Sequence, residues 1–176
     1  FAREFGRVAW GIYADYRAEI EYRTVDPRPK SVVSDLNLST GATLSLGECY
    51  RLGTSVNLRV YRQKSSMSFY APLGGPKLYQ MLGLGMYSTR FSSSENNTSV
   101  YFSGRTYGAG LELFPRDGAG LFLSVHYSGW AVRRILPGYQ KLPLTRLVDN
   151  VFDGALGWQG QSGIHHWGIK LSGNYA

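Results

Sequence analysis

Hydrophobic and polar residues alternate along residues 7–24. This segment is far longer than the five or six residues of an ordinary strand. The apolar set occupies the even positions, namely Val8, Trp10, Ile12, Ala14, Tyr16, Ala18, Ile20 and Tyr22. A period of two is typical of a β-strand with one apolar and one polar face. At about 3.4 Å per residue the segment spans on the order of 60 Å, more than a tilted strand needs to cross a bilayer. We therefore interpret it as a membrane-barrel strand.

The alternation returns in seven later segments. The predicted strands are residues 31–47, 55–61, 78–90, 99–114, 121–133, 152–159 and 167–175. Prolines and glycines predict a turn at 25–30 and longer connections at 63–77 and 134–149. Arg105 interrupts the apolar set of its strand, which favours a bulge or an interfacial position there.

Short links between successive strands predict an all-β, antiparallel up-and-down sheet in one domain, residues 1–176. Strand edges exposed to lipid are too costly, so such a sheet closes into a transmembrane β-barrel. Eight strands can close alone or form part of a larger barrel. We expect the larger barrel, because the chain starts at Phe1 without a signal sequence and ends at Ala176 within a predicted strand. A soluble barrel or sandwich is the alternative, and strand length argues against it.

Composition changes this picture little. The chain is 43% hydrophobic, but its mean hydropathy is only −0.22 and no apolar run reaches the length of a spanning helix. A helical membrane protein is excluded, whereas a barrel is not, because alternating strands hide their affinity for lipid. Tyrosine, at 13 residues, and glycine, at 22, suit aromatic girdles and tight turns. The single Cys49 excludes an intrachain disulfide framework.

The net charge of +7 restricts the partners. The lysines and arginines are scattered without a basic cluster or recognition motif, so we expect no nucleic acid. Attraction to anionic lipid head groups, with outer-membrane lipid and lipopolysaccharide as the expected partners, or a lumen that favours anions explains the surplus more simply.

A ladder of charged residues follows the polar face of the first strand and consists of Asp15, Arg17, Glu19, Glu21 and Arg23. These side chains are expected to project into the lumen at intervals of about 7 Å. They either form a path for ions or substrate, or neutralise one another and brace the interior together with Asp35 and Arg59. We favour bracing.

The connection after the third strand contains an apolar stretch that is unusual for a linker. Its residues Met67, Phe69, Tyr70 and Pro72 are candidates for folding over the barrel mouth or contacting a partner protein.

The histidines of the chain do not form a convincing catalytic or metal-binding motif. His126 shares a strand face with Ser124 and Ser128, but residues two apart do not form a nucleophile–base pair, and no orienting carboxylate was assigned. His165 and His166 point to opposite faces, which defeats chelation from one strand. We expect no enzyme activity, metal or cofactor.

Several segments carry a resemblance to a known family. They are residues 21–30, Ser34-Asp35-Leu36, Ser68-Phe69-Tyr70, residues 104–108 and Leu142-Pro143-Leu144. In these the chain resembles an uncharacterised outer-membrane β-barrel family of the Bacteroidota, whose members are longer. The resemblance implies an outer-membrane location and an association with TonB-dependent uptake loci, and it transfers no functional residue.

Three functions are therefore considered. The first is an outer-membrane barrel that passes or takes up solute, alone or as an accessory to a TonB-dependent transporter. The second is a structural barrel whose loops at 67–72 and 136–147 hold partners such as surface lipoproteins. The third, least favoured, is a barrel hydrolase.

Overall fold

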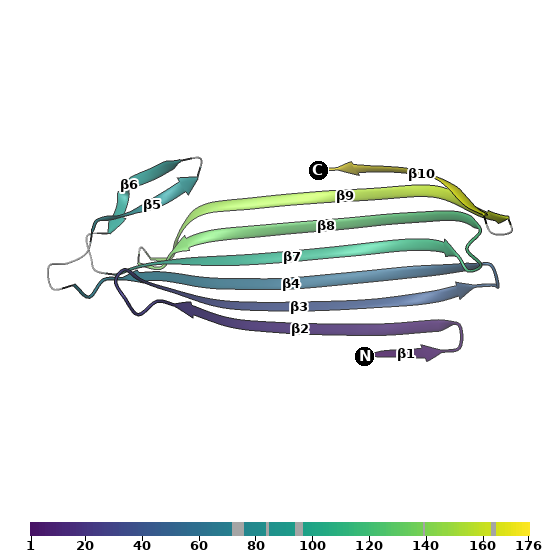
Figure 1. Cartoon of the computed structure of the whole chain (residues 1–176), viewed down its shortest axis with the longest axis horizontal. Coiled ribbons are helices and arrows are strands. Elements are labelled where there is room, and N and C mark those ends of the chain that lie inside the picture. The colour runs from purple at the N-terminus through teal and green to yellow at the C-terminus, as the bar shows by residue number, and fades with distance from the viewer. Residues whose placement is uncertain (72–75, 84, 94–96, 139, 163–164) are drawn as a thin grey trace.

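The computed structural model describes residues 1–71, 76–83, 85–93, 97–138, 140–162 and 165–176, and this part of the chain is all-β (Figure 1). The strands are β1 (Ala2–Phe5), β2 (Val8–Tyr22), β3 (Arg28–Leu46), β4 (Tyr50–Ser68), β5 (Leu78–Gly83), β6 (Met86–Ser93), β7 (Asn97–Pro115), β8 (Gly120–Leu136), β9 (Leu142–Ser162) and β10 (His165–Tyr175).

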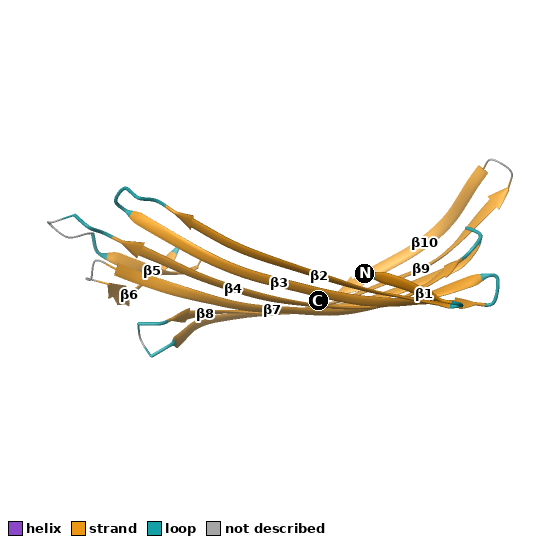
Figure 2. Ribbon diagram, turned by 90° about the horizontal axis from the view of Figure 1, so that it is seen from below, coloured by secondary structure: helices purple, strands orange, loops and turns teal. Residues whose placement is uncertain are grey.

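Eight strands form one antiparallel sheet in the order β1-β2-β3-β4-β7-β8-β9-β10, and β5 and β6 form a separate hairpin. The predicted antiparallel meander is confirmed. The sheet is curved but open, with β1 and β10 as its edges (Figures 1 and 2). The eight strands therefore do not close on themselves.

Several predicted boundaries are wrong. β4 continues to Ser68 and pairs with β3 throughout, and β9 begins at Leu142, so most of the two predicted connections is strand. Residues 78–90 belong to the β5–β6 hairpin rather than to the sheet, and β1 was not expected. The extended end of β4 is polar at nearly every position, and the extended end of β9 has apolar residues on both faces, with Val148 on one and Leu147 and Val151 on the other. Neither end therefore shows a period-two alternation.

Arg105 does not mark a bulge. It pairs in register with Val60 on β4 and with Ala131 on β8. Among the described residues of the main sheet, the strand register shifts between Arg134 and Ile135, where β8 pairs with β9. The interfacial position, which is the other expectation for Arg105, stays a prediction.

The register separates the sheet into two chemically different faces, because cross-strand partners lie on the same side. The face that contains Val8, here called the apolar face, includes a continuous row of leucines. From β3 to β10 this row is Leu44, Leu52, Leu113, Leu123, Leu156 and Leu171. The opposite side, here called the polar face, contains the row Arg17, Asp35 and Tyr61.

The two ends of the sheet differ in their connections. At one end, here called the turn end, the links are Gly6-Arg7, residues 47–49 and residues 116–119. At the other, the loop end, β2 joins β3 through residues 23–27, β4 joins β7 through the segment that contains the hairpin, and β8 joins β9 through residues 137–141. Figure 1 shows the hairpin at the loop end.

Candidate functional site

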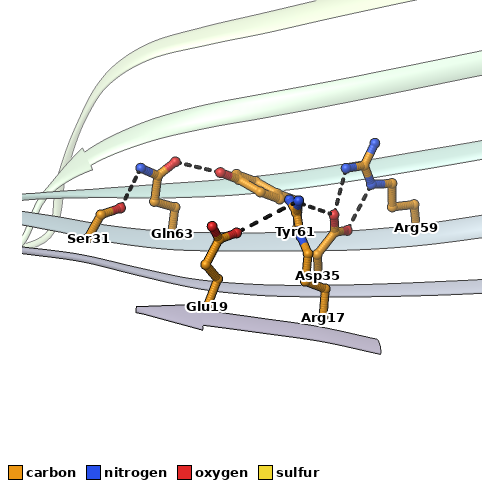
Figure 3. Close-up of polar contacts among 7 residues, drawn as sticks. All are labelled: Arg17, Glu19, Ser31, Asp35, Arg59, Tyr61 and Gln63. Atoms are coloured by element: carbon orange, nitrogen blue, oxygen red, sulfur yellow. Dashed lines mark hydrogen bonds and ion pairs between the residues drawn. The ribbon is translucent and has the colours of Figure 1, made fainter. Parts of the chain in front are cut away.

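An ion-pair cluster centred on Asp35 lies on the polar face (Figure 3). Arg59 donates from Nε to Asp35 Oδ1 at 2.8 Å and from Nη2 to Oδ2 at 2.6 Å. Arg17 Nη2 lies 3.6 Å from the same Oδ2, and its Nη1 lies 3.8 Å from Glu19 Oε2. Asp35 is 8% exposed, so its charge is compensated where it is partly removed from solvent.

Strand register explains why these residues meet. Arg17 and Asp35 are direct partners across β2 and β3, whereas Arg59 pairs with Asn37 and reaches Asp35 diagonally. A diagonal of about 7–8 Å is within reach of a long side chain. Three strands therefore supply one cluster, and each strand contributes a residue from its polar face.

A neutral hydrogen-bond network continues the cluster toward the loop end (Figure 3). The Tyr61 hydroxyl donates to Gln63 Oε1, and Gln63 Nε2 donates to Ser31 Oγ and Ser65 Oγ, both at 2.9 Å. The network spans β3 and β4. It holds the side chains of the polar face in place beyond the charged groups.

The predicted charged ladder is only partly joined. Arg17, Glu19, Asp35 and Arg59 come together, whereas Asp15, Glu21 and Arg23 form no ion pair within the part of the chain that the structure describes. Glu21 and Arg23 instead line a groove of about 620 Å³ at the loop end, which β5 also borders. The joined residues link β2, β3 and β4, whereas Asp15, Glu21 and Arg23 are exposed. Bracing by the ladder stays a prediction.

His126 has a carboxylate partner that sequence reasoning missed. Its Nε2 lies 2.9 Å from Glu112 Oε1 on β7. His126 is opposite Gly110, two residues from Glu112, so only the register of β7 and β8 reveals the pair. Ser55 also faces Gly110, on the β4 side. Among the described contacts no hydroxyl is hydrogen-bonded to His126, so a nucleophile–base pair is not assembled.

The candidate partner loop is tied to the neighbouring β2–β3 connection. The Tyr70 backbone N–H donates to Asp26 Oδ2 at 2.9 Å, and Arg28 Nε donates to Asp26 Oδ1 at 2.8 Å. The Arg28 guanidinium carbon lies 4.2 Å from the centre of the Tyr70 ring. The Tyr70 N–H, with Arg28 beside it, holds the pKa of the Asp26 carboxyl below its ordinary value.

The other members of that loop have different positions. Met67 belongs to β4 and pairs with Pro29 and Thr98, so its assignment to a loop is wrong. Phe69 follows the strand and is half-buried. Pro72 lies outside the described residues.

The β5–β6 hairpin is anchored to the sheet by polar contacts. Arg134 on β8 donates from Nη2 to Gln80 Oε1 at 2.9 Å and from Nη1 to the Met81 carbonyl. Gln80 Nε2 donates to Thr98 Oγ1 at 3.3 Å, and Gln80 is 5% exposed. Gln80 therefore links the hairpin to two strands of the main sheet.

The described residues contain neither a cluster of metal-ligating side chains nor a membrane-spanning helix. No group of three or more His, Cys, Asp or Glu side chains in that part of the chain is arranged to hold a metal ion. There is also no helix there with the length and apolar character to cross a membrane.

The fold defines an all-β protein built on an open antiparallel sheet with one apolar and one polar face. The chain belongs to the family described as "Family of unknown function (DUF6850)", whose model matches residues 1–176. No curated protein and no solved structure matches the chain.

Proposed function

We propose that this sheet is part of the wall of a transmembrane β-barrel in a Gram-negative outer membrane, and that the barrel passes or takes up solute. One observation carries the proposal. The large hydrophobic side chains of the apolar face are uncovered, including Ile12 at 44% exposure, Val56 at 55% and Phe152 at 50%. Lipid is the cover that such a face needs.

The described residues of the sheet form almost no hydrophobic core. Among the described residues, Leu136 alone is a hydrophobic residue classed as buried, at 2% exposure. A soluble sheet of this size would bury its apolar face against a second layer, because large exposed apolar patches favour association. The β5–β6 hairpin does not supply that layer, since its anchors Thr98 and Arg134 lie on the polar face.

The height of the apolar band suits a bilayer. On β4 it extends from Leu52 to Val60, nine residues, or about 30 Å along the strand. Tilting the strand by about 40° reduces this to roughly 23 Å, close to the apolar band of outer-membrane barrels. Trp158 and Trp167, with ring centroids 4.4 Å apart, lie beyond the leucine row at the turn end, where an aromatic girdle is expected.

In this proposal further strands pair with β1 and β10, because open edges are not tolerated in lipid. The polar face then lines the lumen. The Asp35 cluster braces the wall, while Asp15 and the groove beside Glu21 and Arg23 remain accessible to solute. An accessory role beside a TonB-dependent transporter is part of the proposal and rests on the resemblance described above.

Conductance in planar bilayers tests the proposal. Purified protein is expected to require detergent and to produce discrete conductance steps. The variant Val56→Asp places a charge on the apolar face and is expected to abolish insertion, whereas Asn57→Asp, one residue later on the polar face, is not. Protein that stays monodisperse without detergent would contradict the membrane location, and inserted but silent protein would contradict solute passage.

A second function, the holding of a partner protein, is favoured by the β5–β6 hairpin. Four large side chains of this hairpin are exposed outside the main sheet: Tyr79, Met81, Met86 and Tyr87. Methionine and tyrosine are enriched at protein interfaces. If the hairpin holds a partner, replacing Met81 and Met86 by Ser will release a co-purifying protein without changing conductance. A complex of unchanged composition would remove this function.

A further inference from the structure

The apolar face carries a group of basic residues at the loop end, although it carries no acidic residue on any described strand of the main sheet. We call this group the basic belt: Lys30, Arg62, Lys64, Arg105, Arg133 and Arg146. All six are exposed. The acidic residues on the described strands of the main sheet lie on the polar face, namely Glu4, Asp15, Glu19, Glu21, Asp35, Glu112, Asp149 and Asp153.

Two members of the basic belt are direct neighbours of like charge. Arg133 on β8 pairs with Arg146 on β9, and Arg62 lies in the same row, with only Ser103 of β7 between it and Arg133. Like charges directly opposite each other destabilise a sheet. Among the described contacts, none of these three guanidinium groups has a carboxylate partner. An anion from outside the chain would compensate them.

The position of the row identifies the class of anion. On β4 the apolar band ends at Val60, and the next row outward contains Ala18, Arg62, Arg133 and Arg146. In a membrane this row lies at the level of the lipid head groups. Arginine binds phosphate through two parallel N–H donors, so a row of arginines suits phosphorylated head groups.

The connections indicate which leaflet this is. Outer-membrane barrels have short turns on the periplasmic side and longer loops outside, and the basic belt lies at the loop end. The outer leaflet there contains phosphorylated lipopolysaccharide. We propose that the basic belt binds the phosphate groups of lipopolysaccharide, with Arg133 and Arg146 sharing one phosphate. This inference rests on the proposed membrane location.

Lipid selectivity after reconstitution tests the inference. The protein is inserted into phosphatidylcholine vesicles that contain trace fluorescent lipid A, and energy transfer from its tryptophans measures local enrichment of lipid A. Wild-type protein is expected to enrich lipid A over a fluorescent phosphatidylcholine, and added salt to weaken the enrichment. The triple variant Arg62→Gln, Arg133→Gln, Arg146→Gln should lower it at least about tenfold, given the attraction of each cation near an anionic surface.

A matched control removes the same number of charges elsewhere. Arg51 and Lys170 on the polar face and Arg116 at the turn end are replaced together by Gln, and lipid A enrichment should be retained. Equal enrichment in wild type and the belt variant would overturn the inference, as would an equal loss in the control. Protease protection in vesicles of pure phosphatidylcholine measures membrane insertion separately from lipid A binding. Loss of protection would show that the membrane proposal itself fails, whatever the charge of the head groups.

Discussion

Arg59 and Asp35 form a two-point ion pair between β4 and β3, although neither residue is the direct cross-strand partner of the other. The guanidinium reaches across the diagonal and meets both carboxylate oxygens. Arg17 approaches the same carboxylate from β2, so one acidic group links three strands. In the proposed barrel this cluster stiffens the wall on its lumen side.

Loss of Arg59 is expected to destabilise the sheet. The variant Arg59→Met leaves the nearly buried Asp35 carboxylate with Arg17 alone, 3.6 Å away. We expect the free energy of unfolding, measured by urea titration in vesicles, to fall by about 1–3 kcal/mol. The control is Asp15→Asn, since Asp15 is on the same face, exposed and without an ion pair in the described part of the chain. An unchanged midpoint for Arg59→Met would show that the pair does not brace the wall.

Gly108 is expected to tolerate no side chain. A Cβ atom there would overlap Asn57 Oδ1 and lie 3.1 Å from the Tyr127 carbonyl oxygen. Gly108→Val should cost about 1–3 kcal/mol through overpacking, and Asn57→Ala in the same chain should restore part of the loss. Gly154→Val is the matched control, because a Cβ atom there meets nothing within 4 Å. Equal stability of the two glycine variants would contradict the packing argument.

The contact between Tyr70 and Asp26 should depend on pH. The folded pKa of Asp26 is below its ordinary value because the ionised carboxylate accepts the Tyr70 N–H and pairs with Arg28. The stabilisation is therefore fully present above the ordinary value of about 3.9 and is lost as the pH falls through the lower folded pKa. The Tyr70 amide shift measured by NMR should titrate in that acidic range. In Asp26→Asn the titration should disappear, and persistence would assign it to another group.

The single cysteine offers a test of orientation. Cys49 is exposed at the turn end, which the proposal places on the periplasmic side. A thiol reagent that cannot cross the outer membrane should label it only after the membrane is permeabilised. With Cys49→Ser and Thr24→Cys, the thiol moves to the β2–β3 loop and should react in intact cells. The reverse pattern would invert the orientation and contradict binding of the basic belt to the outer leaflet.

The alternation of residues such as Val8, Trp10 and Ile12 was sufficient to predict an all-β antiparallel sheet with one apolar face. It was sufficient because side-chain direction in a strand depends only on position along the chain. The charged ladder was likewise predicted from residue spacing, and Asp35 and Arg59 were named as its cross-strand partners. The ends of β4 and β9 were missed, because the end of β4 is polar at nearly every position and the end of β9 is apolar on both faces, so neither has an alternation to detect.

Only the tertiary structure decided which residues of different strands meet. The pairing of His126 with Glu112, the opposition of Arg133 to Arg146 and the attachment of Gln80 to Arg134 all depend on register and on the path of the β5–β6 hairpin. A shift of one residue between two strands would leave the alternation within each strand unchanged while moving every cross-strand partner. The pattern along the chain therefore determined what each face is made of, and strand pairing determined which charges lie together on it.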